Sequence, residues 1–350
     1  MRGRAPEIII YWRVGGRIDL ELKGGVLVAH PVIIYNMISA LAVSVFILGR
    51  WGVLLVLGVA SGFSSNYDEQ YGIEAAQLAG VAYCDVPMSM ALSCPACGVI
   101  NSTYTSLNMT EVAAEWGVHA FVIMKSEQKR RVVVAFRGTD SPLELVSEIA
   151  HDMATLYPFC EVEKGNGVKL QNYFVTVYEA LRPAFREALT RILSETPEDY
   201  EFLFTGHSLG ASLTAIAAAD AMHTGMLRVT PKVYTFGEPR TGNYEFAMWF
   251  SEMFPEYFRV THYRDLVVHV SPCMPSFQGG CSTDIGLLGW APYHGGTEVH
   301  YSEYNQSHEV LQEFESPKGS NQYTMVDVTD HLYYYGFRVG CGDWQWDPVI

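Results

Sequence analysis

The chain has 350 residues, of which 49% are hydrophobic, and its formal net charge is −15. A chain of this length can form a large domain with a substantial core. An acidic surface repels nucleic acids and anionic membrane surfaces, so the composition excludes nucleic acid as a partner and favours an uncharged substrate.

Two apolar segments lie near the N-terminus. The first, Pro31 to Gly49, carries no charge and is long enough to cross a bilayer. The second, Trp51 to Ala60, is followed by small residues and is similar to a signal-peptide core with its cleavage site. We therefore predict that residues 1–62 are a signal peptide, with a retained signal anchor as the alternative.

The predicted mature part is a single domain over residues 63–350. Export would place it outside the cell or in the lumen of the secretory pathway, whereas a retained anchor would hold it on a membrane. Met37 could also be the true start, and residues 1–36 would then be an extension outside the natural protein.

The seven cysteines all follow the predicted export segment: Cys84, Cys94, Cys97, Cys160, Cys273, Cys281 and Cys341. In an exported protein they predict disulfides plus one leftover thiol, but spacing does not give the pairing. Cys94 and Cys97 have no second such pair and no histidine at zinc-finger spacing, so we predict no metal site. Three sequons are compatible with glycosylation in an exporting compartment: Asn101, Asn108 and Asn305.

Along the chain, the first predicted strands are 119–124 and 131–136, and the polar turn between them suggests a hairpin. Helices and strands then alternate: helix 172–193, strand 200–205, helix 208–223, strand 232–236, helix 243–254, strand 257–262 and a further strand at 295–301. This alternation predicts an α/β fold with a mainly parallel sheet and helices on both faces.

A separate helix is predicted to begin at Ser141. Ser141 can cap it, Pro142 suits the first helical position, and Glu144 completes the capping box. Its apolar residues fall on one face at helical spacing: Leu143, Val146, Ile149, Ala150 and Met153.

The most informative motif is Gly206-His207-Ser208-Leu209-Gly210, which lies between a predicted strand and a predicted helix. A serine on a sharp strand-to-helix turn projects its hydroxyl clear of the backbone. A side chain at either flanking glycine would collide with the neighbouring strand or helix. We therefore predict that Ser208 is a nucleophile.

A serine nucleophile needs a histidine base and a carboxylate that holds the histidine. Asp265 is the first carboxylate after a strand downstream of Ser208, so we predict that it is the acid. The alternative is that it caps a turn or pairs with Arg264. Asp220 is expected on a solvated face of the helix that follows Ser208, and Asp284 is a weaker candidate.

Two histidines remain as candidates for the base. In a triad on this type of sheet the chain order is serine, then acid, then histidine, and His331 is the last histidine of the chain. His294 is its rival. His207, next to the nucleophile, is predicted to be a packed neighbour. The oxyanion of the tetrahedral intermediate needs donors, for which the backbone N–H of Leu209 and Thr139 at the end of a strand are candidates.

Five segments carry a resemblance to a known family: Phe136–Thr139, Thr205–Ala211, Phe236–Asn243, Arg264–Val267 and Asp330–Tyr334. Their order is similar to that of the class 3 lipases, the group of filamentous-fungal triacylglycerol lipases. The resemblance covers roughly Tyr67 to Tyr335. It implies an α/β-hydrolase fold with a mostly parallel sheet and a helical lid.

Position by position, the resemblance implies Ser208 as nucleophile, Asp265 as acid and His331 as base. Thr139 and Leu209 would form the oxyanion hole, and His294 would be the family's structural histidine, which precedes a strand. The implied disulfides are Cys84–Cys341, Cys94–Cys97 and Cys273–Cys281, with Cys160 free or paired with a partner molecule.

The helix that begins at Ser141 occupies the position of the family's lid. A lid covers the site in water and opens on a lipid surface, which would give the protein a peripheral membrane contact; ordinary core packing is the alternative. Two segments depart from the family: Ser141–Asp152 lacks the tryptophan found in many lids, and Gln171–Phe174 replaces a frequent His-x-Gly-Phe.

The sequence therefore predicts a serine carboxylic-ester hydrolase without a cofactor, acting on lipid esters at a lipid–water interface, with acylglycerols foremost. The alternatives are a phospholipase A1 or a polar-ester esterase with the same triad, or acyl transfer to an alcohol other than water. The alternative from a different functional class is a catalytically inactive protein that binds lipids.

Overall fold

The computed structural model describes residues 8–13, 17–22, 67–139, 141, 147, 156–158, 167–273, 281, 291–303 and 307–342. The chain divides into two compact units, Met1–Ser64 and Ser65–Ile350. In the first unit, β1 (Ile8–Arg13) and β2 (Arg17–Leu22) form an antiparallel hairpin. The two apolar segments on which the export prediction depends lie outside the described residues. Within the described part of the chain, no helix has both the length and the apolar character needed to cross a membrane.

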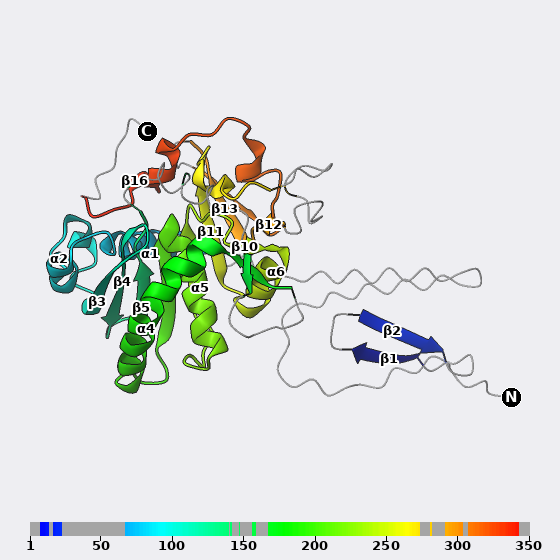
Figure 1. The fold of residues 1–350 in the computed structure, drawn as a ribbon, viewed down its shortest axis with the longest axis horizontal. Coiled ribbons are helices and arrows are strands. Elements are labelled where there is room, and N and C mark those ends of the chain that lie inside the picture. The colour runs from blue at the N-terminus through cyan, green and yellow to red at the C-terminus, as the bar shows by residue number, and fades with distance from the viewer. Residues whose placement is uncertain are drawn as a thin grey trace. The chain divides into compact units, whose positions relative to one another are not determined.

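The second unit contains an eight-stranded sheet (Figure 1). Its strands lie in the order β14 (His308–Leu311), β13 (Thr297–Tyr301), β11 (Tyr257–His262), β9 (Lys232–Phe236), β8 (Glu201–His207), β5 (Arg131–Phe136), β4 (Gly117–Ser126) and β3 (Thr105–Ala114). The strands from β13 to β5 pair in parallel, and the pairs at both edges are antiparallel. The predicted mainly parallel sheet is confirmed, and so is the predicted hairpin, which is β4 with β5.

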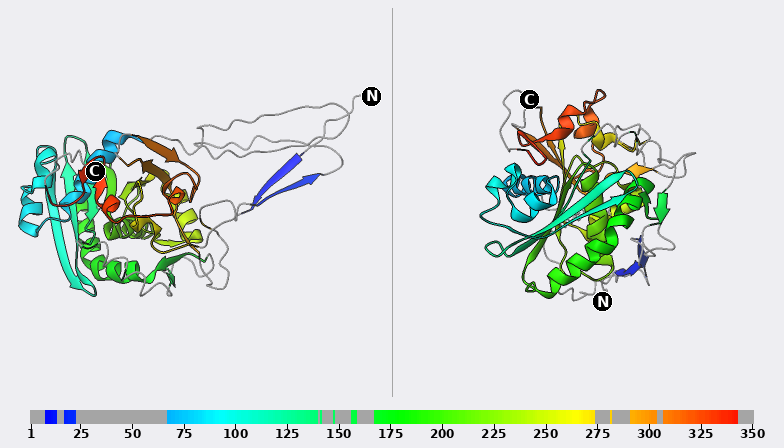
Figure 2. Two further views of the ribbon diagram at one scale, coloured as in Figure 1. Left: turned by 90° about the horizontal axis from the view of Figure 1, so that it is seen from above. Right: turned by 60° about the vertical axis from the view of Figure 1, so that its left-hand side comes forward.

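Helices cover both faces of this sheet, as predicted (Figures 1 and 2). On one face pack α4 (Asn172–Ser194), α5 (Leu209–His223) and α6 (Tyr244–Met253), and on the other packs α1 (Glu69–Val81). Alternate residues of β5 supply the two cores: Val132, Val134 and Phe136 face α4 and α5, and Val133 and Ala135 face α1. A strand buried on both faces needs apolar residues at every position, which explains the continuous Val-Val-Val-Ala-Phe run.

Smaller elements complete the unit. A four-stranded sheet lies in the order β12 (Pro292–Tyr293), β10 (Gly242–Asn243), β7 (Lys169–Gln171) and β6 (Leu156–Pro158), and β15 (Tyr333–Tyr334) pairs with β16 (Phe337–Arg338). The short helices are α2 (Val86–Ala91), η1 (Pro95–Val99), η2 (Val267–His269), η4 (Ser320–Gln322) and η5 (Thr329–Leu332).

The helix that follows Ser208 is buried on all sides, since every residue of α5 from Leu209 to Ala221 is inaccessible to solvent. The prediction of a solvated face at Asp220 is therefore wrong. The helix α4 covers this position, and the Asp220 carboxylate accepts hydrogen bonds from the Tyr178 hydroxyl (2.7 Å) and the Arg186 Nε (2.8 Å). A buried carboxylate is tolerated when it is paired in this way.

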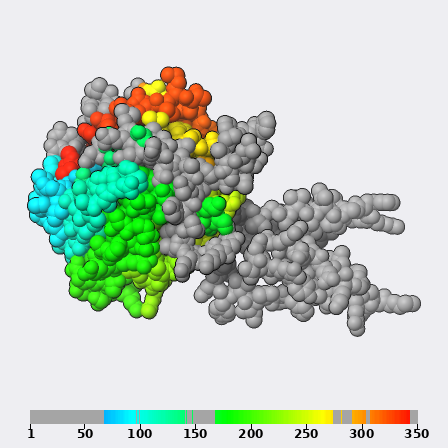
Figure 3. Space-filling view, viewed as in Figure 1, coloured from blue at the N-terminus to red at the C-terminus, as the bar shows by residue number. Residues whose placement is uncertain are grey.

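The described residues form three disulfides, Cys84–Cys341, Cys94–Cys97 and Cys273–Cys281, which are the pairings that the resemblance implied. Cys160 lies outside the described residues. The Cys84–Cys341 bond joins residues 257 positions apart, and the red C-terminal residues lie against the cyan segment in Figure 3. Closing so long a loop in the unfolded chain corresponds to about 5 kcal/mol of stabilisation.

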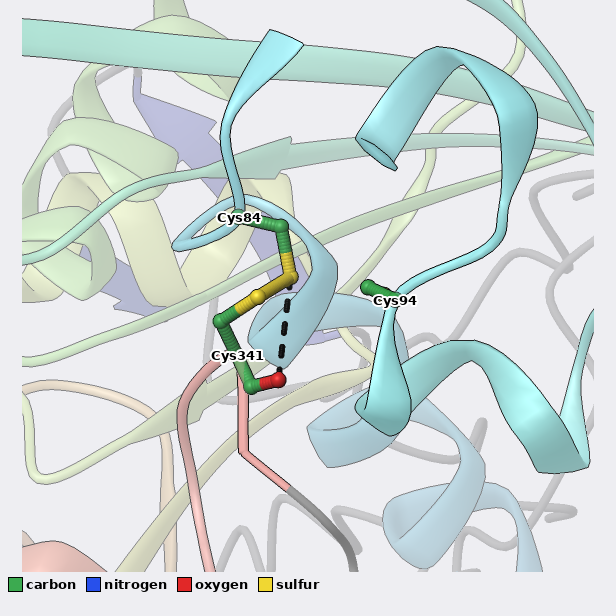
Figure 4. Close-up of side chains that lie close together, drawn as sticks. All are labelled: Cys84, Cys94 and Cys341. Carbon is green, nitrogen blue, oxygen red and sulfur yellow. Dashed lines mark hydrogen bonds between the residues drawn. A yellow bond between two sulfur atoms is a disulfide. The ribbon is translucent and has the colours of Figure 1, made fainter. Parts of the chain in front are cut away.

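Two of these disulfides are neighbours. The Sγ atoms of Cys84, Cys94 and Cys341 all lie within 4.8 Å of one another (Figure 4). Each of these sulfurs is already bonded to another sulfur, so none is a thiolate that could ligate a metal ion.

The sequons occupy different environments. Asn101 is exposed in a turn, whereas Asn108 is half-buried in β3 and its amide donates a hydrogen bond to the Thr110 hydroxyl. Asn305 lies outside the described residues. Asn101 is therefore the more accessible of the two described acceptors.

Candidate active site

Ser208 lies at the turn between β8 and α5, with φ 62° and ψ −131°. A residue with a side chain rarely adopts this conformation, which stores backbone strain. The turn also packs tightly: a Cβ at Gly206 would lie 2.3 Å from the Gly210 carbonyl oxygen, and one at Gly210 would lie 2.2 Å from the Phe136 carbonyl oxygen. The structure thus has the strained strand-to-helix turn that the motif predicted.

Asp265 and His331 form a buried pair, although 66 residues separate them. Asp265 follows β11, His331 lies in η5, and the distance from His331 Nδ1 to Asp265 Oδ2 is 2.9 Å, with both side chains inaccessible to solvent. A carboxylate only accepts, so Nδ1 carries the proton and Nε2 is the basic nitrogen. The backbone joins the two loops as well, because Leu266 N donates to the Asp327 carbonyl oxygen.

The Asp265 carboxylate is held ionised by its neighbours. Burial by itself would raise its pKa, but the facing His331, the Tyr334 hydroxyl (2.8 Å) and the Val267 N–H (2.7 Å) together hold the pKa below its ordinary value. The group is therefore a carboxylate at neutral pH, able to stabilise a positive charge on His331.

Tyr334 is a residue of this site for which sequence reasoning assigned no role. It belongs to the last segment of the family resemblance, at Asp330–Tyr334, and that position was its only signal. Its buried hydroxyl donates to the same carboxylate oxygen, Oδ2, that accepts from His331. Tyr334 thus helps to fix the orientation of the carboxylate.

We expect the substitution Tyr334→Phe to lower kcat on a soluble ester about tenfold, because a hydrogen bond to a charged group contributes about 1.5–3 kcal/mol. Tyr335→Phe is the matched control, since the Tyr335 hydroxyl bonds the Tyr67 hydroxyl at 2.7 Å. Equal losses in both variants, at unchanged thermal stability, would contradict a role for Tyr334 in orienting Asp265.

His207 packs against the pair, as predicted. Its ring stacks on the ring of His331 with centroids 4.5 Å apart, and its Nε2 lies 2.8 Å from the His331 carbonyl oxygen. The carbonyl only accepts, so Nε2 is protonated and Nδ1 accepts from the Tyr83 hydroxyl at 2.7 Å. Burial lowers the pKa of His207 to about 3, so the ring is neutral at neutral pH and supports His331 without adding charge.

The other candidates lie elsewhere. His294 is buried, its Nε2 donates to the Val268 carbonyl oxygen at 2.9 Å, and burial places its pKa well below the ordinary value. Arg264 pairs with Asp330 (3.6 Å) and not with Asp265. Asp284 lies outside the described residues. Of the two candidate histidines, His331 therefore donates to Asp265, and the rival His294 bonds elsewhere.

The predicted oxyanion donors lie on either side of the turn. Leu209 is the first residue of α5, where a backbone N–H has no partner within the helix. Thr139 follows β5, its side chain is half-buried, and its hydroxyl accepts a hydrogen bond from Ser141 N at 3.3 Å.

Two buried atoms of the site have no hydrogen-bond partner among the described residues: Ser208 Oγ and His331 Nε2. The hydrogen bond between Ser208 and His331 is thus not formed in this structure, and such bonds often tighten only when substrate is bound. Neither atom is hydrogen-bonded to another described group.

The predicted lid lies mostly outside the described residues. Only Ser141 and Ser147 of that segment are described, and Ser147 is helical. The lid stays a prediction.

Comparisons with known proteins agree with this architecture. The family model "Lipase (class 3)" matches residues 133–274, a range that includes Ser208 and Asp265. A Caenorhabditis elegans lipase, ZK262.3, is 34% identical over 153 residues, which cover 43% of this chain and 41% of that protein. A Rhizopus niveus lipase is 26% identical over 277 residues, which cover 76% of this chain and 63% of that protein. The chain thus spans about half the length of these curated relatives.

The solved structure of lipase II from Rhizopus niveus has the same fold, with a TM-score of 0.65 at 23% identity, covering 78% of this chain and 96% of that one. At this identity the likeness concerns the fold alone. Taken with the matching family model and the aligned relatives, it shows that the chain has the α/β-hydrolase fold and is similar to the class 3 lipases.

Proposed function

We propose that this protein is a serine carboxylic-ester hydrolase that acts on lipid esters, acylglycerols foremost. One observation carries the proposal: the buried Asp265–His331 pair adjoins the strained turn at Ser208, and Ser208 Oγ and His331 Nε2 both lack a hydrogen-bond partner among the residues that the structure describes. The relatives named as lipases support an ester as the substrate.

In the proposed mechanism, Ser208 Oγ attacks the ester carbonyl carbon while His331 Nε2 takes the hydroxyl proton. Asp265 stabilises the positive charge that forms on His331. The N–H of Leu209 and Thr139 donate to the oxyanion, and each such donor contributes about 3 kcal/mol to lowering the barrier. His331 then gives the proton to the departing alcohol, and an acyl-enzyme remains on Ser208.

Water completes the cycle. His331 Nε2 takes a proton from water, the resulting hydroxide attacks the acyl carbon, and the fatty acid leaves as Ser208 recovers its proton. The neutral, stacked His207 keeps the His331 ring in one orientation through both steps.

We further propose that the segment from Ser141 to Met153 acts as a lid that opens on a lipid surface and exposes its apolar face. A secreted protein is in keeping with the three disulfides, because disulfides persist in oxidising compartments. Residues 1–62 would direct that export, and N-terminal sequencing of the native protein should then find a mature chain that begins near residue 63.

The test of the proposed function is a substrate comparison at matched acyl chains: an emulsified triacylglycerol, a soluble short-chain ester and an N-acyl amide. We expect hydrolysis of both esters, a rise in triacylglycerol hydrolysis above its solubility limit, and no amide hydrolysis. Equal rates on the amide, or no turnover of any ester, would contradict the proposal. If the rate of triacylglycerol hydrolysis depends hyperbolically on concentration, with no rise at the solubility limit, the lid proposal is contradicted and the proposed ester hydrolysis is not.

A further inference from the structure

A cavity of about 260 Å³ adjoins the candidate active site. Its lining includes Thr139, His207 and Leu332, which are the candidate oxyanion donor, the residue before Ser208 and the residue after His331. The other lining residues are Tyr83 and the C-terminal segment from Arg338 to Gly342. A group attached to an ester held at Ser208 could therefore extend directly into this cavity.

The cavity carries a single cation. Among its described lining residues, only Arg338 has a charged side chain, because His207 is neutral. Arg338 is exposed and lies on β16, opposite Tyr333 on β15. In a chain whose net charge is −15, a cation in the cavity that adjoins the candidate site points to an anionic group on the substrate.

The wall that carries Arg338 is fixed in place. Val339 N donates to the Leu332 carbonyl oxygen at 2.9 Å, and the Cys84–Cys341 disulfide ties the segment to the residues that follow α1. A cation on a pre-organised wall loses less conformational freedom when it binds a ligand.

The same wall is open to a ligand because two of its residues are glycines. A Cβ at Gly340 or at Gly342 would meet no atom within 4 Å, so the space in front of this backbone is free. Neither glycine has a positive φ, so a side chain would fit there without backbone strain.

We propose that this cavity binds the phosphate of a glycerophospholipid whose acyl ester lies at Ser208, and that Arg338 contacts the phosphate. The inference rests on the proposed function. A guanidinium presents paired N–H donors that match two phosphate oxygens. The reaction stays a hydrolysis: water replaces the glycerol oxygen on the acyl carbon, and a fatty acid and a lysophospholipid leave.

The test compares two lipids with identical acyl chains, a phosphatidylcholine and a diacylglycerol, in the same nonionic mixed micelles. Phosphatidylcholine has no net charge, so the micelle surface charge does not change between the two. We expect Arg338→Gln to lower kcat/KM on phosphatidylcholine about 10- to 100-fold, as for loss of hydrogen bonds to a charged group. The value for diacylglycerol should stay within about twofold, and Arg338→Lys should recover part of the loss.

Two further variants separate this site from general effects. Arg228→Gln makes the same charge change at an exposed residue between α5 and β9, which does not line the cavity, and should alter neither lipid. Gly340→Leu fills the cavity and should lower phosphatidylcholine hydrolysis more than diacylglycerol hydrolysis. A parallel fall on both lipids in Arg338→Gln, or an equal effect of Arg228→Gln, overturns the inference.

The remaining outcomes distinguish the inference from the proposed function. If the protein hydrolyses diacylglycerol but not phosphatidylcholine, the inference fails and the proposed function stands. If Ser208→Ala retains the wild-type rate on both lipids, the two fail together. Inorganic phosphate should compete weakly; strong inhibition of diacylglycerol hydrolysis that Arg338→Gln abolishes would assign the cavity to a free anion and overturn the lipid assignment.

Discussion

Replacing Ser208 by alanine is expected to lower kcat for ester hydrolysis about 10⁵- to 10⁶-fold. The strained turn carries Ser208 next to His207, whose ring stacks on the His331 ring of the buried Asp265–His331 pair. Without it there is no acyl-enzyme, and only binding and oxyanion stabilisation remain to assist direct attack by water. The measurement is kcat on a soluble chromogenic ester.

Ser212→Ala is the matched control for this variant. Ser212 lies one turn further along α5, is fully buried and accepts a hydrogen bond from the Thr241 hydroxyl at 2.9 Å. We expect it to cost about 1 kcal/mol of stability and to leave kcat within a few-fold of the wild type. A Ser208→Ala protein that keeps more than a hundredth of the wild-type kcat would contradict the assigned nucleophile.

Replacing Asp265 by asparagine is expected to lower kcat about 10⁴-fold. The Asn side chain has the same shape, but its NH₂ group would donate toward His331 Nδ1. That contact forces the histidine proton onto Nε2, so the ring presents a donor where Ser208 needs an acceptor. The lost negative charge also leaves the imidazolium without stabilisation. The measurement is kcat at saturating ester between pH 6 and pH 9.

Asp327→Asn tests whether this loss is specific. Asp327 pairs with Asp265 through the backbone, but its exposed side chain accepts hydrogen bonds from Thr329, whose N–H lies at 2.7 Å. We expect kcat to stay within a few-fold of the wild type. If Asp265→Asn unfolds at the wild-type temperature and yet retains a tenth or more of the activity, Asp265 is not the acid.

The central elements of the fold were predictable because their signals are local. The continuous apolar run at 132–136 indicates a strand buried on both faces, and the glycines two residues before and after Ser208 indicate a turn with no room for a side chain at those positions. These patterns depend on neighbouring residues only. The strands β5, β8, β9 and β11 and the helices α4, α5 and α6 therefore begin and end close to the predicted residues.

The sequence did not reveal elements that lack such a pattern. The helix α1 is apolar mainly in its second half, from Ala75 to Val81, and β3 is polar and only partly buried, so neither shows a clean period. Asp220 was placed wrongly for a related reason. Its burial depends on α4, which packs over it from a distant part of the chain.

The site was predictable in its residue types but not in its contacts. Residue order favoured His331 and left His294 open as an alternative. Only the structure distinguishes these two histidines, because His331 bonds Asp265 and His294 does not. The roles of Tyr334 and Gly237 also depend on tertiary contacts. Tyr334 bonds Asp265, and a Cβ at Gly237 would lie 2.6 Å from His331 Nδ1, so the glycine leaves room for the ring.

The most direct test of the proposed nucleophile is covalent labelling with a lipid-like fluorophosphonate, followed by mass spectrometry of the digested protein. We predict one adduct per chain, on Ser208, with activity lost in proportion to labelling and no adduct in Ser208→Ala. Full inactivation with the adduct on another residue, or a hydrolytically active enzyme that never labels at Ser208, would contradict the account.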